Sequence, residues 1–149
     1  MLLHSPPGTS LIEIVLVLVL MSALLFLGSA SYGTARDVMA VRAARDGIVA
    51  ASARARALAV RHGGASLSVD GAAGSMRITT RDGVVSESVD LATDLDVRVG
   101  IDAAHGATSV SLQYDALGIG RLANRTIALS RGAASGGVTF SAYGRPREW

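Results

Sequence analysis

The first residues that could carry chemistry in this 149-residue chain are Gly8, Thr9 and Glu13. Glu13 stands at the entrance to an uncharged stretch, Ile14–Ala35, where a carboxylate is costly to bury and calls for a positive partner. Cleavage after Gly8 would create a new ammonium group on Thr9, four residues before Glu13. In a bundle of such helices, the amine of one subunit could pair with Glu13 of its neighbour and lower the cost of both buried charges.

The other ionisable residues show no catalytic or metal-binding pattern. No nucleophile or second ligand stands at a workable spacing from any of the three histidines, His4, His62 and His105. No EF-hand spacing links the acidic residues Asp90, Asp94, Asp96 and Asp102. The Gly118-Ile119-Gly120 segment lacks the third glycine and the helix of a dinucleotide loop. The chain has no cysteine. The sequence therefore predicts no enzyme, no metal and no cofactor.

Near the C-terminus, Arg145 and Arg147 flank Pro146, which restricts the backbone and can present both guanidinium groups to solvent. All fourteen basic residues are arginines, yet the net charge is only +2. Two nearby turns carry further arginines, Arg121, Arg125 and Arg131. This tail suits contact with anions; a solvated edge or docking onto a neighbouring subunit are the alternatives.

The apolar run Val15–Leu27 must position Glu13. As a helix rising about 1.5 Å per residue, the uncharged stretch spans roughly 33 Å, enough to cross the hydrocarbon core of a bilayer. The sequence thus predicts a transmembrane and assembly helix over residues 9–33. A plain signal peptide is the alternative, because small residues at 28–31 could form a cleavage site. However, the head of the chain has no Lys or Arg.

From Ala35 to His62 the pattern changes to that of an amphipathic helix. Apolar residues recur at spacings of three and four and form one stripe of Val41, Ala44, Ile48, Ala51, Ala55 and Leu58. Gly33 can bend the helix without ending it. Gly63-Gly64 is typical of a helix C-cap. We therefore expect one long helix whose second half packs on a domain.

After Gly64 the period becomes two, which indicates strands. The expected strands cover residues 65–69, 75–79, 84–89, 95–99, 109–114, 126–130 and 138–141. No crossover helix separates them, so the sheet should be mostly antiparallel, with one face covered by the helix. The predicted class is α+β, with an amphipathic helix at 34–62, a sheet within 65–143 and a basic tail at 144–149.

The N-terminal pattern Gly8-Thr9-Ser10-Leu11-Ile12-Glu13-Ile14 resembles the class III signal of type IV pilins and pseudopilins. Three further segments resemble the minor pseudopilins of the GspH/FimT family: residues 53–58, 112–118 and 138–147. Thr9 replaces the phenylalanine usual at the first mature position, and the leader offers only His4 in place of Lys or Arg. Arginines follow the apolar helix, against the usual positive-inside charge bias.

The resemblance implies a type IV pilin-like fold and a structural role in a type II secretion system or type IV pilus. Residues 1–8 would be a leader removed by prepilin peptidase, with cleavage after Gly8 and methylation of Thr9. Glu13 would act in assembly with other pilins. The domain 34–149 would lie in the periplasm, and the helix in the lipid of the bacterial inner membrane. The alternative implied function is a DNA-binding minor pilin that acts in DNA uptake through Arg145 and Arg147, where guanidinium groups would hold phosphates and Tyr143 or Trp149 could stack on bases.

Overall fold

The computed structural model describes residues 10–102, 108–121 and 125–149, without the side chains of 27–31. The chain divides into two compact units, Met1–Ala35 and Arg36–Trp149. One helix, α1 (Leu11–His62), contributes to both units. The single long helix predicted from the sequence is therefore confirmed, and Gly33 lies within it. Gly8 and Thr9 lie outside the described residues.

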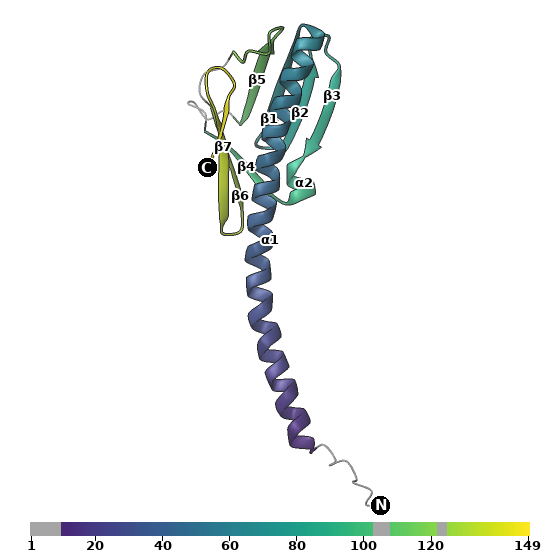
Figure 1. Ribbon diagram of the computed structural model, residues 1–149, viewed down its shortest axis with the longest axis vertical. Helices are drawn as coiled ribbons and strands as arrows, with labels where there is room; N and C mark the ends of the chain where they lie inside the picture. Colours follow the sequence, from purple (N-terminus) through teal and green to yellow (C-terminus); the bar gives the residue numbers. More distant parts are fainter. Residues whose placement is uncertain (1–9, 103–107, 122–124) are drawn as a thin grey trace, which may run out of the picture. The chain divides into compact units, whose positions relative to one another are not determined.

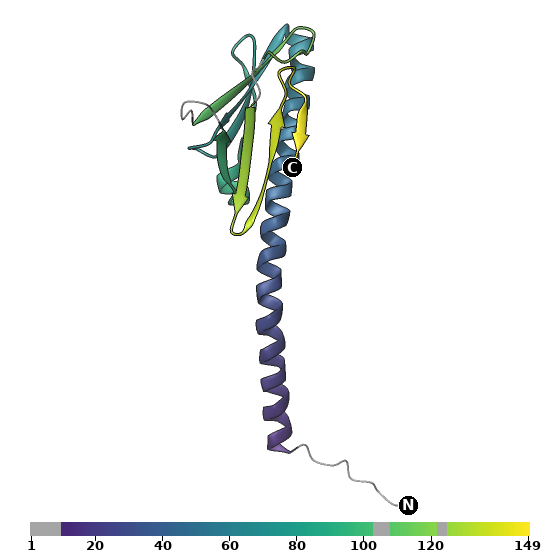
Figure 2. The same ribbon diagram turned by 90° about the vertical axis from the view of Figure 1, so that its left-hand side faces the viewer.

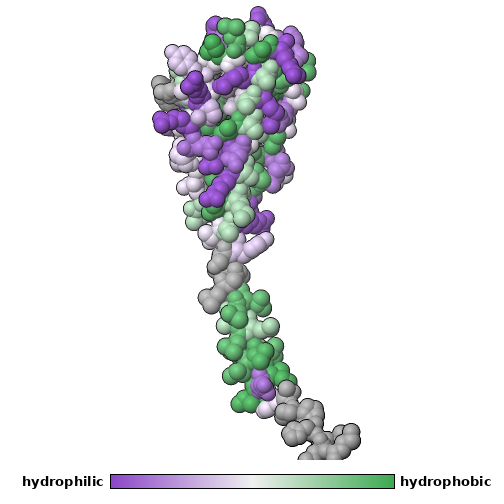
Figure 3. Space-filling view, in the orientation of Figure 1, coloured by the Kyte–Doolittle hydropathy of each residue, from purple (hydrophilic) through white to green (hydrophobic). Residues whose placement is uncertain are grey.

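In the first unit, the described residues of α1 are almost all apolar, and Figure 3 shows this segment as a band of hydrophobic side chains. Within the described residues, however, no helix combines the length and the apolar character needed to span a membrane. The transmembrane helix predicted over residues 9–33 is therefore not confirmed.

In the second unit, α1 packs against the strands through the predicted stripe. Its first five members, Val41, Ala44, Ile48, Ala51 and Ala55, are buried in the core. Leu58, the sixth, is half-buried, and its neighbour Ala59 is fully buried instead. Because most buried helix residues are alanines, the helix backbone can approach the sheets closely. The helix ends at Gly63, whose φ of 74° is the left-handed conformation of a C-cap.

The first sheet has the strand order β3-β2-β1-β5, and every pair is antiparallel. Its strands are β1 (Gly64–Asp70), β2 (Ser75–Thr80), β3 (Val85–Asp90) and β5 (Ser109–Asp115). Alternate residues of β1 and β5, such as Leu67 and Leu112, enter the core. In Figure 1, β3 lies at one margin of this sheet, beside the short helix α2 (Leu91–Leu95).

The second sheet has the order β4-β6-β7-β8 and is also antiparallel. Its strands are β4 (Arg98–Asp102), β6 (Arg125–Arg131), β7 (Ala134–Phe140) and β8 (Pro146–Glu148). Figure 2 shows β8 as the last strand of the chain, beside α1. The two central strands of this sheet contribute four buried side chains to the same core: Ile127, Leu129, Val138 and Phe140.

The α+β class and the antiparallel pairing are confirmed, but several details of the elements differ from the prediction. The described strands form two sheets where one was expected. The strand predicted at 95–99 is wrong in its first half, because Asp90 caps α2 by accepting the Thr93 N–H at 2.9 Å and draws Leu95 into that helix. The expected basic tail contains a strand, β8, which pairs with β7.

Candidate assembly surfaces

Glu13 lies in the first turn of α1, where its backbone N–H donates to the Ser10 carbonyl at 2.9 Å. Its side chain is exposed, and within the described residues it forms no ion pair. A carboxylate at a helix N-terminus is favoured by the helix dipole. The exposed carboxylate of Glu13 can accept a cation from another chain. Thr9, the predicted source of that cation, lies outside the described residues.

The large apolar side chains that follow Glu13 are uncovered. Between Leu11 and Phe26 they are 49% to 79% exposed. Monomeric soluble proteins rarely expose a continuous apolar surface of this kind, and such surfaces mark contacts with other proteins or with membranes. This segment of α1 can therefore bind a second apolar surface.

In the second unit, two salt bridges fasten the helix to opposite sheet margins. Arg54 makes a two-pronged contact with Glu87 of β3, with both N–O distances at 2.7 Å. Arg45 reaches Glu148 of β8 at 3.1 Å. These salt bridges hold β3 and β8, the first and last strands of the two sheets, against one helix.

A third ion cluster joins the start of this helical segment to α2. The side chain of Arg131, only 13% exposed, lies 3.0 Å from Asp37 and 3.5 Å from Asp96. It also donates to the Leu95 carbonyl at 2.6 Å. Sequence reasoning grouped Arg131 with the arginines near the tail, but its guanidinium is taken up by these contacts. Arg131 is thus a structural residue.

Arg147 of β8 and Trp149 after it project from the face opposite to Glu148. Glu148 points to Arg45 of the helix, and successive residues of a strand point to opposite faces, so Arg147 and Trp149 point the other way. Trp149 exchanges two backbone hydrogen bonds with Gly137, and its ring lies where a β-carbon on Gly137 would be. Arg145 and Arg147 are both exposed and have no ion-pair partner in the described part of the chain. The sequence singled out the two arginines but missed β8, which contains Arg147; the alternation Arg-Pro-Arg-Glu-Trp was the available signal.

Arg56 fixes the turn that leads into this strand. Its guanidinium donates to the Gly144 carbonyl at 3.0 Å and lies 5.5 Å from the centre of the Tyr114 ring. Burial raises the pKa of the Tyr114 hydroxyl, an effect that the positive charge of Arg56 partly offsets. Tyr114 therefore stays neutral well above physiological pH and serves as a packing residue.

An open hollow of about 670 Å³ lies at the end of α1, between β1, β2 and β5. Its titratable lining residues are Arg81, Tyr114, Asp115 and Arg121. Asp115 is engaged, because it accepts two backbone N–H groups and lies 3.8 Å from Arg121. Among the described residues, no histidine lines the hollow.

The remaining sequence candidates do not converge. His62 is exposed at the end of α1, whereas His4 and His105 lie outside the described residues. Asp90 and Asp96 cap the two ends of α2, and the hydrogen bonds from Thr93 lower the pKa of Asp90 below its usual value. Across the described residues, no group of acidic or histidine side chains could hold a metal ion.

Comparison with known proteins gives a fold. No protein-family model matches the chain, and no curated protein matches it. Two solved structures do, both of the type IV minor pilin FimU of Pseudomonas aeruginosa strain PAO1, in two crystal forms. Their TM-scores are 0.53, with 16% and 17% identity. The match covers 72% of this chain and 86% and 91% of those chains. The type IV pilin-like fold predicted from the sequence is thus confirmed.

Proposed function

We propose that this chain, which has the fold of a type IV minor pilin, is a structural subunit of a pilus or of a secretion pseudopilus. One observation carries the proposal: an exposed apolar helix begins with a carboxylate that forms no ion pair among the described residues, and it leads into a compact domain of pilin-like fold. An exposed apolar surface of this size marks contact with other proteins or with a membrane. A subunit that bundles with its neighbours would bury it.

The finer steps belong to the same proposal. Prepilin peptidase would cut after Gly8, and Thr9 would carry the new, methylated amine. The apolar helix would be held in the bacterial inner membrane with the domain in the periplasm, and would later pack among the helices of other pilins. Glu13 would pair with the amine of a neighbour. The resemblance to GspH/FimT pseudopilins supports these steps, and so do the exposed apolar side chains from Leu11 to Phe26.

Replacing Glu13 with glutamine is expected to lower co-assembly with partner pilins. The buried amine of the neighbour would lose its counter-charge, and we expect about a tenfold fall, equivalent to about 1.4 kcal/mol. The measurement is the fraction of the chain that co-purifies with sheared filaments from the native host. Glu13→Val should behave in the same way.

The matched control is Asp102→Asn, which removes one exposed carboxylate from β4 that makes no ion pair among the described residues, and it should leave co-assembly unchanged. Equal co-assembly by the Glu13 variants and the unaltered chain would reject the proposed role of Glu13. If mass spectrometry showed that residues 1–8 are still present on the chain in the filament, cleavage after Gly8 would be rejected.

A second candidate function is DNA binding, as in a minor pilin of DNA uptake. The exposed side chains of Arg145, Arg147 and Trp149, close together in the sequence, favour it. Two guanidinium groups that have no ion-pair partner among the described residues can hold successive phosphates without reading sequence, and a nearby indole can stack on a base.

Reversing both arginines, Arg145→Glu and Arg147→Glu, is expected to weaken DNA binding about tenfold and to reduce the slope of log affinity against log salt by about 2, since each lost phosphate contact removes roughly 0.9. The measurement is fluorescence anisotropy with the full chain in detergent. Arg77→Glu with Arg98→Glu is the control, because it makes the same charge change on exposed strand residues elsewhere. Absence of binding at low salt would dismiss this function.

A further inference from the structure

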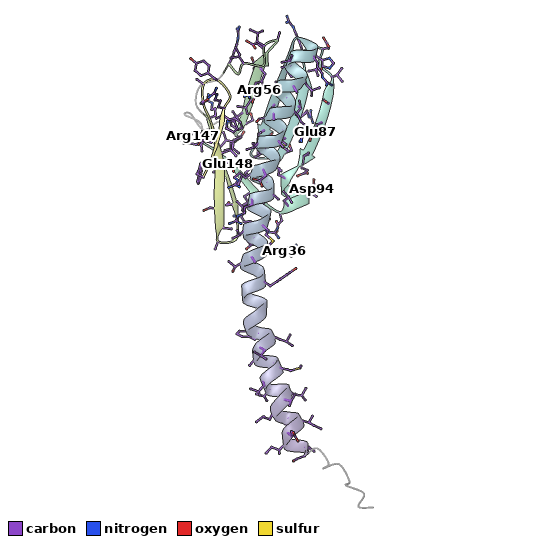
Figure 4. All side chains as sticks on the ribbon, in the orientation of Figure 1. Arg36, Arg56, Glu87, Asp94, Arg147 and Glu148 are labelled. Atoms are coloured by element: carbon purple, nitrogen blue, oxygen red, sulfur yellow. The ribbon has the colours of Figure 1, made fainter. Side chains whose placement is uncertain are left out.

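Two strand margins of the domain lie on opposite sides of α1. β3 is the outer strand of the first sheet, and β8 is the outer strand of the second. Arg54 holds β3 and Arg45 holds β8. Nine residues separate these arginines, about two and a half helical turns, so their side chains leave the helix in opposite directions. Figure 4 shows this arrangement, with Glu87 on one side of α1 and Glu148 on the other.

The β3 margin is acidic. The segment 82–96, defined here as the acidic edge, has five acidic residues and no basic one: Asp82, Glu87, Asp90, Asp94 and Asp96. Arg54 neutralises Glu87, and Arg131 lies near Asp96. The other three are exposed and have no arginine partner among the described residues. Val84 and Val85, exposed by 62% and 48%, add apolar surface to this edge.

The β8 margin is basic. The segment 141–149, defined here as the basic edge, carries Arg145 and Arg147, which have no ion-pair partner within the described residues. Its one acidic residue, Glu148, is bound to Arg45. Pro146 has no N–H and cannot donate to an added strand. A partner therefore meets this edge through side chains rather than through a new backbone ladder.

We propose that the acidic edge of one copy of this chain binds the basic edge of a second copy, head to tail. The two edges have opposite charge and lie on opposite sides of the domain. When two copies bind, one copy therefore keeps an unoccupied basic edge and the other an unoccupied acidic edge, and each can bind a further copy. Two different surfaces in contact generate an open array instead of a closed pair. Contacts between two acidic or two basic edges are disfavoured by like charge. The inference rests on the proposed function and specifies which surfaces of the domain meet in the assembly.

Cross-linking tests the geometry, because the chain has no cysteine and introduced thiols are the only ones present. Ser88→Cys marks the acidic edge, and Ala142→Cys marks the basic edge; both positions are exposed. The two full-length variants carry different tags and are mixed in detergent with a flexible bis-maleimide. We expect a mixed dimer from the pair, about tenfold above either variant alone, since like edges repel.

Ser111→Cys is the matched control, an exposed serine on the outer face of β5, away from both edges. Paired with either edge variant, it should give only the background yield. Self-cross-linking of the Ser88→Cys chain at the yield of the mixed pair would indicate a symmetric contact and overturn the proposal.

Charge exchange then tests the chemistry. Asp82→Arg with Asp94→Arg on the Ser88→Cys chain should lower the cross-link about tenfold, because two attractive pairs become repulsive. Arg145→Asp with Arg147→Asp on the Ala142→Cys chain should do the same, and combining both altered chains should restore the yield. Neither acidic residue makes a hydrogen bond or ion pair in the described structure, so the fold should survive.

Three outcomes would overturn the proposal: a cross-link insensitive to charge reversal, no recovery in the exchanged pair, or loss of the cross-link after nuclease treatment, which would mean that DNA bridges the copies. The Glu13 variants report on the helix and this experiment reports on the domain. Failure of one is therefore distinguishable from failure of the other.

Discussion

Replacing Gly137 with alanine is expected to lower the free energy of unfolding by about 2–3 kcal/mol, the range typical of an overpacked site. A β-carbon at this position would lie 2.5 Å from the carbonyl oxygen of Ile127 and 2.6 Å from Cζ2 of Trp149. The indole could move aside, but the carbonyl belongs to the backbone of β6 and is fixed by its strand pairing. Removing this steric clash would thus require β7 to move away from β6 and the Trp149 ring to move away from Gly137.

The matched control is Gly100→Ala in the same sheet, where the nearest atom to the new methyl group would be the Ala128 β-carbon at 3.7 Å. This variant should change stability by well under 1 kcal/mol. Urea unfolding followed by tryptophan fluorescence measures both, because Trp149 is the only tryptophan in the chain. Equal urea midpoints for the two variants would show that the packing of Trp149 over Gly137 does not contribute to stability as described.

Gly137 also illustrates a feature that could not be predicted from the sequence. Its neighbourhood, Ser135-Gly136-Gly137-Val138, suggests a strand only from Val138 onward, because glycine weakens the alternating pattern. In the structure β7 begins at Ala134, and Gly137 is needed because Trp149, twelve residues later, packs over it. A contact between two distant segments leaves no local signal, so β8 and its role in the second sheet were missed.

The long helix and most strands were predictable because their signals are local. The spacing of Val41, Ala44 and Ile48 identified the buried face of α1, and the alternation around Leu67 identified β1. The short helix α2 was missed because Val97 and Val99 extend the alternation backward over Leu95, whereas the Asp90 cap decides otherwise.

The candidate site divides in the same way. Glu13 was identifiable from its place beside an apolar run, and Arg145 and Arg147 from their position around Pro146. The charged edges of the domain could not be identified from the sequence, because their net charge depends on which side chains are neutralised by ion pairs in the folded domain. Arg54 and Glu87 are 33 residues apart in the chain, and their pairing follows only from the packing of β3 on α1.

Replacing Ala55 with leucine is expected to lower the free energy of unfolding by about 2–3 kcal/mol, since three added carbons must fit into a filled core. Ala55 is fully buried, and so are Ala44 and Ala59, each with no exposed surface. These alanines place the helix backbone close to both sheets, so the larger side chain can be accommodated only by moving α1 outward. Such a shift would strain the Arg54–Glu87 and Arg45–Glu148 contacts, which hold the two sheet margins to the helix.

The matched control is Ala53→Leu, two residues earlier on the exposed side of the same helix. Leucine and alanine have similar helix propensities, so this variant should change stability by less than about 0.5 kcal/mol. Thermal unfolding followed by circular dichroism compares the two, and only the Ala55 variant should melt several degrees lower. If both variants had the same melting temperature, the close approach of α1 to the sheets would not determine the stability of the domain. The buried alanines at 44, 51, 55 and 59 would then be explained by helix propensity alone.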